Sequence, residues 1–188
     1  MERSPQGISR QFRIDLQLKL LRRDWSGIAQ AEPPPEFSEH TRETALDLIN
    51  FFKGLAALRD PDGSPEGAVA FFGALHQQHP HVAAYSMNLF AAEISHLLGT
   101  GGFTELHGFS LVRGRQILAE AEQAMLHLRE VRAPDLEIFN SNKALLLLAL
   151  GQSDRAYGVL ACTPPGRLRD NLAAYSAIAL NLAGGKRS

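Results

Sequence analysis

The stretch Ile49–Val82 reads INFFKGLAALRDPDGSPEGAVAFFGALHQQHPHV and carries the pattern of two helices joined by a tight turn. Apolar residues in its first half recur at spacings of three and four, the period of an amphipathic helix. The residues Asp-Pro-Asp-Gly at 60–63 are typical of a turn. Ser64 can then cap a second helix with Pro65 at its first position, and this helix is expected to stop at Pro80.

The sequence on either side of this stretch is also predominantly helical in pattern. The first helix is expected to begin near Thr41, and further helices are expected at 82–98, 115–129, 136–150, 154–162 and 170–182. The run 143–150 is apolar all round, as in a helix packed between neighbours. The glycine-rich stretch 99–114 predicts a long loop or lid.

The N-terminal segment leaves two interpretations open. Residues 12–20 alternate between apolar and polar, and this periodicity alone indicates a strand. Most of these residues are helix formers, however, and Phe12, Leu16 and Leu20 are four apart, which favours a helix. Asp24 is expected to cap a short second helix that ends before the prolines at 33–35. Residues 1–35 are thus predicted to form a small hairpin with a proline-rich connector.

Bulk composition limits the class of protein. A chain of 188 residues, 45% apolar and 21% charged, is typical of one globular domain, here expected to span 1–188. The formal net charge of −1 provides no positive field for nucleic acid, which is not expected as a partner. Cys162 is the single cysteine, so an intramolecular disulfide is excluded. No run is long enough for a membrane span or a signal peptide, so we expect a cytoplasmic protein with no membrane partner.

The hairpin at 49–82 resembles a tetratricopeptide repeat. The positions that match the usual repeat pattern are Phe52, Leu55, Ala56, Gly63, Ala68, Phe72 and Pro80. At Arg59 the family has an aromatic residue instead. A later unit carries Asn142, Ala144, Gly151 and Ala156 at the same offsets, although Lys143 replaces the expected leucine.

The resemblance implies an all-α, TPR-like array of helical hairpins over residues 41–182. It would form a right-handed superhelix of three to four hairpins with a C-terminal capping helix. The stretch near 99–114 would then be an insertion in the second repeat. Chaperones of bacterial secretion systems are similar in size and repeat count, but no motif links the chain to them.

Proteins of this family bind a peptide along the concave face formed by the first helix of each hairpin. The resemblance places the following residues on that face: Asn50, Lys53, Ala57, Ala84, Met87, Ala91, Ile94, Ile138, Ser141, Leu145 and Leu148. Because the set is mostly apolar, an amphipathic helix or an internal segment of another protein fits better than a charged terminus. The alternative is that the insertion or self-association covers these residues.

Other residues that could carry chemistry have simpler explanations. His76, His79 and His81, with His96 nearby, lack an accompanying acidic ligand, so turn histidines are favoured over a metal site. Cys162 is expected to be a small packing residue rather than a nucleophile. We therefore expect no catalytic, cofactor or metal site. The segment Met1–Arg23 has a net charge of +4 and is expected to be a solvated helix, with an acidic or nucleic-acid contact as the alternative.

The favoured function is a protein-interaction scaffold or adaptor without enzymatic activity, which binds a partner segment in the apolar groove. A first alternative is an enzyme or ligand-sensing domain whose pocket lies between the helices and the 99–114 loop and includes His96, His107 or Glu93. A second alternative is a structural subunit that forms a homodimer through the groove and the N-terminal segment.

Overall fold

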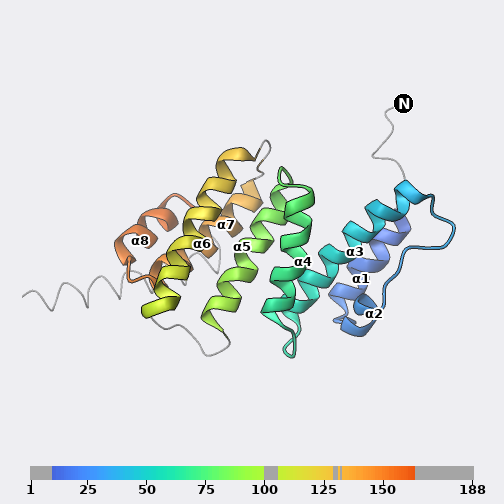
Figure 1. The fold of residues 1–188 in the computed structure, drawn as a ribbon, viewed down its shortest axis with the longest axis horizontal. Coiled ribbons are helices and arrows are strands. Elements are labelled where there is room, and N and C mark those ends of the chain that lie inside the picture. Colours follow the sequence, from blue (N-terminus) through green and yellow to red (C-terminus); the bar gives the residue numbers. More distant parts are fainter. Residues whose placement is uncertain (1–9, 100–105, 129–130, 132, 164–188) are drawn as a thin grey trace, which may run out of the picture. The chain divides into compact units, whose positions relative to one another are not determined.

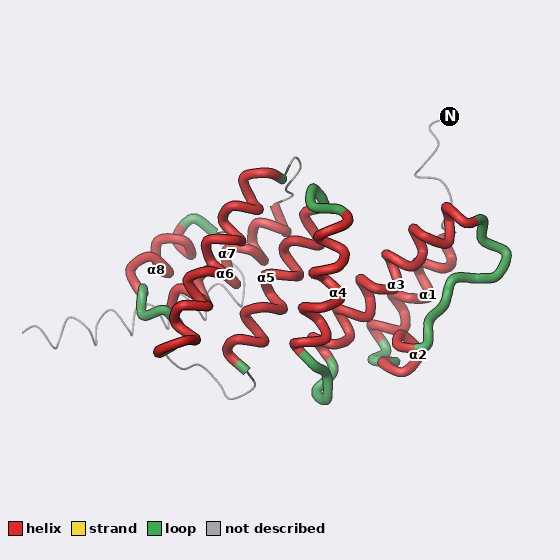
Figure 2. The backbone as a smooth tube through the Cα atoms, viewed as in Figure 1, coloured by secondary structure: helices red, strands yellow, loops and turns green. Residues whose placement is uncertain are grey.

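The computed structural model describes residues 10–99, 106–128, 131 and 133–163. Within these ranges the chain forms eight helices and no strand (Figure 1, Figure 2). The all-α class is therefore confirmed. The chain divides into two compact units, Met1–His79 and Pro80–Ser188, each considered by itself below. The single domain over 1–188 stays a prediction.

The first unit consists of two pairs of helices. Their bounds are Arg10–Leu21 for α1, Trp25–Ala29 for α2, Glu39–Arg59 for α3 and Pro65–Gln78 for α4. Helices α3 and α4 form a hairpin, and α1 and α2 pack on each other and on α3. The helix, turn and helix predicted from the stretch at 49–82 are confirmed.

Side chains cap the helices of this unit where the sequence predicted caps. The Asp24 carboxylate accepts a hydrogen bond of 2.9 Å from the backbone N–H of Gly27 at the start of α2. Ser64 Oγ accepts one of 3.1 Å from Gly67 N, with Pro65 at the first position of α4. These caps satisfy donors that have no partner within a helix, and they fix where each helix begins.

Helix α1 settles the ambiguity of residues 12–20 in favour of a helix. Leu16 is 2% exposed and belongs to a core cluster with Ile28, Ile49 and Phe52, against which Phe12 and Leu20 also pack. The spacing of four among the inner residues of α1 therefore decides the fold. The strand indicated by the alternation is wrong. The helix buries the face that carries Leu16, and the free energy gained by this burial decides the structure over the two-residue alternation of the sequence.

The hairpin α3–α4 is held by a close approach between the two helices. A Cβ atom added to Gly54 would lie 2.7 Å from Cζ of Phe72, whose side chain is completely buried. Phe51 packs edge-on against the Phe72 ring, with 5.8 Å between the ring centroids. Gly54 is therefore needed for its lack of a side chain and not for a turn.

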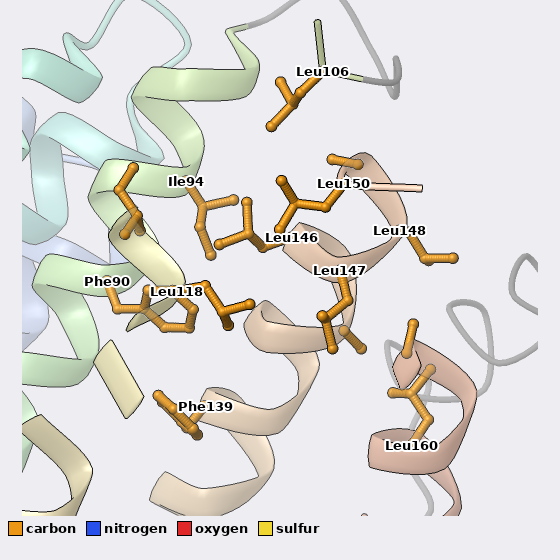
Figure 3. Packing of buried hydrophobic residues seen from close by; sticks show 14 of the residues in the cluster. Phe90, Ile94, Leu106, Leu118, Phe139, Leu146, Leu147, Leu148, Leu150 and Leu160 are labelled. Carbon is orange, nitrogen blue, oxygen red and sulfur yellow. The ribbon is translucent and has the colours of Figure 1, made fainter. Parts of the chain in front are cut away.

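The second unit consists of α5 (Ala83–Leu98), α6 (Gly108–His127), α7 (Ala133–Ala149) and α8 (Ser153–Ala161). Helix α5 packs on α6 and α7, and α7 packs on α8. Figure 3 shows the core of this unit, in which leucines of α7 point toward residues of α5, α6 and α8. Residues 146–150 are all buried, so the predicted sandwiched helix is confirmed.

The loop predicted at 99–114 is too long, because α6 already begins at Gly108. Gly114 lies inside the helix and is buried, and a Cβ there would lie 2.8 Å from Cδ1 of Leu106. The backbone N–H of Leu106 donates a 2.8 Å hydrogen bond to the carbonyl of Ala149. The glycine at 114 thus serves close packing, which the sequence pattern cannot distinguish from a turn signal.

The end of α7 agrees with the sequence prediction. Gly151 ends α7 with a positive φ of 71°, as a glycine after a helix commonly does. The helix expected at 170–182 lies outside the described residues. None of the described helices combines the length and apolar character needed to cross a membrane.

Two glycine-to-alanine substitutions in one hairpin test the close approach of α3 and α4. Gly54→Ala should lower the free energy of unfolding by about 1–3 kcal/mol, because the new methyl group meets the buried Phe72 ring. Gly73→Ala in α4 meets nothing within 4 Å and should raise it by roughly 0.5–1 kcal/mol. Urea unfolding followed by fluorescence of Trp25, in the same unit, measures both. Equal effects of the two substitutions would contradict the packing described.

Candidate functional site

An apolar cleft lies in the first unit, between α2, α3 and the start of α4. Its volume is about 320 Å³, at the lower end of the roughly 300–1,000 Å³ of small-molecule sites. The lining residues are Trp25, Ile28, Ala29, Lys53, Ala56, Ala57, Asp60, Gly63, Ser64 and Phe71. Most of them are apolar, so the cleft suits an apolar side chain or ring.

Helix α2 supplies one wall of the cleft and is held in place from both sides. The Asp24 cap fixes its start, and the ammonium group of Lys19 donates a 2.9 Å hydrogen bond to the carbonyl of Gly27. Ile28 is completely buried against the core, which leaves Trp25 partly exposed at the cleft. Hydrogen bonds to its own cap and to α1 therefore hold this wall of the cleft, although α2 is short.

The rim of the cleft carries one cation and two groups occupied by local hydrogen bonds. Asp60 Oδ1 accepts from the backbone N–H of Asp62 at 3.1 Å, and Ser64 Oγ caps α4. Lys53 forms no ion pair with another described residue. Among the described residues, Lys53 is therefore the cation at this rim that can meet an acidic group of a ligand, with the Asp60 carboxylate also in the lining.

Two of the groove residues predicted in the first unit, Lys53 and Ala57, are brought together in this cleft. Asn50 is partly exposed but is not among the lining residues. The prediction missed Trp25 and Phe71, because it counted only the first helix of each hairpin. The position of the chain's single tryptophan, directly after a helix cap, was a usable signal.

The groove residues predicted in the second unit are divided between core and surface. Met87, Ile94 and Ser141 are 4%, 1% and 2% exposed, and Leu148 is also buried. These four therefore do not line an accessible groove within this unit. Residues with some exposure are Ala84, Ala91 and Leu145, which are half-buried, and Ile138, which is 54% exposed.

The histidines and the cysteine do not form a reactive cluster in the described part of the chain. His79 Nε2 lies 2.9 Å from Oδ2 of Asp47, which ties the end of α4 to α3. No group of three His, Cys, Asp or Glu side chains among the described residues is placed to hold a metal ion. Cys162 is exposed at the end of α8, so the packing role expected for it is wrong.

Glu93, which the enzyme alternative placed in a pocket, forms an ion pair inside the second unit. Its Oε1 accepts a 2.8 Å hydrogen bond from Nη2 of Arg113, whose Nη1 is also 3.7 Å from Oε2 of Glu120. Burial raises the pKa of the Glu93 carboxyl above 4.5; Arg113 opposes this rise, and Glu120 adds to it. His96 and His107 are both exposed. Glu93 thus connects α5 to α6.

A comparison of the chain with protein-family models finds no match, and neither curated proteins nor solved structures give one.

The burial of the Glu93 carboxyl predicts a specific pH dependence of stability. The pKa of Glu93 is higher in the folded chain than its ordinary value of 4.5, so the folded chain takes up the proton first as the pH falls. Protonation in that range therefore stabilises the folded state relative to the unfolded one. The unfolding free energy of the wild type should therefore rise, relative to that of Glu93→Gln, as the pH is lowered from neutral toward 4.5. Denaturant unfolding of both proteins by circular dichroism across this range measures the difference. A relative loss of stability would mean that Arg113 outweighs burial.

Proposed function

We propose that this chain is a protein-interaction module, without enzymatic activity of its own, that binds a segment of a partner protein in the cleft of its first unit. The observation that carries the proposal is the cleft itself. It is walled by Trp25, Phe71 and the alanines of α3, and its rim carries Lys53, which forms no ion pair with a described residue. Tryptophan is among the residues most enriched where binding energy concentrates in protein interfaces.

The repeat pattern in the sequence supports the same proposal. Positions that resemble the tetratricopeptide family are buried within the hairpins, as the family pattern requires: Ala56, Ala68, Phe72, Ala144 and Ala156. We infer that α3–α4, α5–α6 and α7–α8 are hairpins of one TPR-like right-handed superhelix. Such arrays present the first helix of each hairpin to a peptide.

The chemistry of the cleft limits the segment that fits. Trp25, Phe71, Ala29 and Ala57 give the cleft a mostly apolar lining, so the anchor is a large aliphatic or aromatic side chain. Lys53 favours an acidic residue near that anchor, since a charged hydrogen bond is stronger than a neutral one. An amphipathic helix with one apolar anchor and a flanking Asp or Glu meets both requirements.

Peptide selection on the intact chain tests the proposal. A library of helical peptides selected on the wild-type protein should yield sequences with an apolar anchor beside an acidic residue. Their binding should change the fluorescence of Trp25, the only tryptophan, because it lines the cleft. Ala57→Phe should weaken this binding at least about tenfold, because its ring occupies the space of the anchor.

Ala74→Phe is the matched control. Ala74 is exposed on α4 and is not among the cleft residues, so this substitution should leave the selected peptides bound as tightly as before. Circular dichroism checks that both variants remain folded. If the peptides bind both variants equally, or if none changes the Trp25 emission, the cleft is not the binding site.

A further inference from the structure

Helix α1 carries a second apolar stripe on the side away from the core. Its members are Ile14, Leu18 and Leu21, spaced by four and three residues as in the seam between two packed helices. Leu21 is 76% exposed and Leu18 is 37% exposed, while Ile14 is partly exposed. The alternating sequence of residues 12–20 thus gives the helix two apolar faces, of which only one is buried in its unit.

The outer stripe is not needed to hold α1 in place. The inner residues already anchor the helix: Leu16 is buried, and the ring of Phe12 packs edge-on against that of Phe37 at 5.6 Å. Lys19 adds its hydrogen bond to α2. The outer stripe is therefore presented in a fixed orientation, with little ordering of α1 left to lose when a partner binds.

Arginines surround this outer stripe. Arg10, Arg13, Arg22 and Arg23 are all exposed, and none of them pairs with an acidic group in the part of the chain described. Asp15 is the only acidic residue between positions 10 and 23, and it accepts a hydrogen bond of 2.8 Å from Gln11. Asp15, Asp24 and Glu32 line a hollow beside Leu18 and Arg22, so this side of the stripe carries both signs of charge. Arginines still outnumber acidic residues within α1 and its last turn, and the surface of α1 combines an apolar centre with a mainly positive border.

From this combination we propose that the outer face of α1 binds an acidic amphipathic helix of a partner protein. Leucines and isoleucines of that helix would pack on the stripe, and its Glu or Asp residues would pair with the arginines. A second copy of α1 fits poorly, because it would bring arginines against arginines. Nucleic acid also fits poorly, because an apolar stripe occupies the centre of the surface.

A designed peptide provides the probe for this surface. The peptide is a helix with leucines spaced by four and three residues and glutamates on both sides of that stripe, and its control has the same composition in scrambled order. Fluorescence anisotropy of the labelled peptide is measured with the full chain at low and high salt. We expect binding of the designed peptide only, with weaker binding at high salt because charges are screened.

Two variants separate the apolar and charged contributions. Leu21→Asp should weaken binding at least about tenfold, whereas Leu46→Asp should not change it, since Leu46 is an exposed leucine of α3. Arg10→Glu combined with Arg22→Glu should abolish binding and favour a peptide with lysines in place of glutamates. Ala57→Phe should leave the binding intact, because the cleft is a separate site.

Three results would overturn the proposal. One is equal binding of the designed and scrambled peptides, and another is binding that survives Leu21→Asp. The third is evidence that something else occupies the stripe. This would be a dimer, seen by analytical ultracentrifugation, that Leu21→Asp abolishes. It would also be binding to phosphatidylserine vesicles that is tighter than binding to the peptide and is weakened as much by Leu21→Asp.

Discussion

The close approach of α3 and α4 at Gly54 is the constraint on which the first unit depends. The Phe72 ring occupies the space that a side chain at position 54 would need. This contact fixes the spacing of the two helices, and therefore the distance between Lys53 and Ala57 on one helix and Phe71 on the other. The position of the cleft walls formed by α3 and α4 thus follows from packing that involves neither a ligand nor a charged pair.

A second consequence of the sequence is that one short helix carries two surfaces. The alternation in α1 buries Leu16, packs the partly buried Phe12 and Leu20 against the core, and leaves a second stripe facing away from it. A helix that only needed to cover the core would carry polar residues there. The cleft and the outer face of α1 are both in the first unit, which is where we propose that partners bind.

Most helices could be predicted from the sequence, because their caps and periods are local signals. Asp24, Ser64 and Gly151 stand at helix ends in the sequence and in the structure. The start of α6 could not be predicted, because Gly114 resembles a loop residue until Leu106 is seen against it.

The candidate site was predictable only in part. Lys53 and Ala57 were identified through the repeat pattern, but Met87 and Ile94 turned out to be buried. An apolar residue that lines a groove and one that fills a core have the same chemistry, so only the packing of neighbouring helices separates them. Trp25 lies on α2, which precedes the predicted repeats, so the repeat pattern could not identify it.

Site-specific photo-crosslinking in cells that produce the full chain tests the central claim most directly. With p-benzoylphenylalanine at position 71, at the cleft, irradiation should link the chain to an apolar helical segment of another protein, and Ala57→Phe should prevent the link. The same group at position 74 should give no such product. Equal crosslinking from both positions, or a product at position 71 that persists with Ala57→Phe, would contradict a binding cleft between α2, α3 and α4.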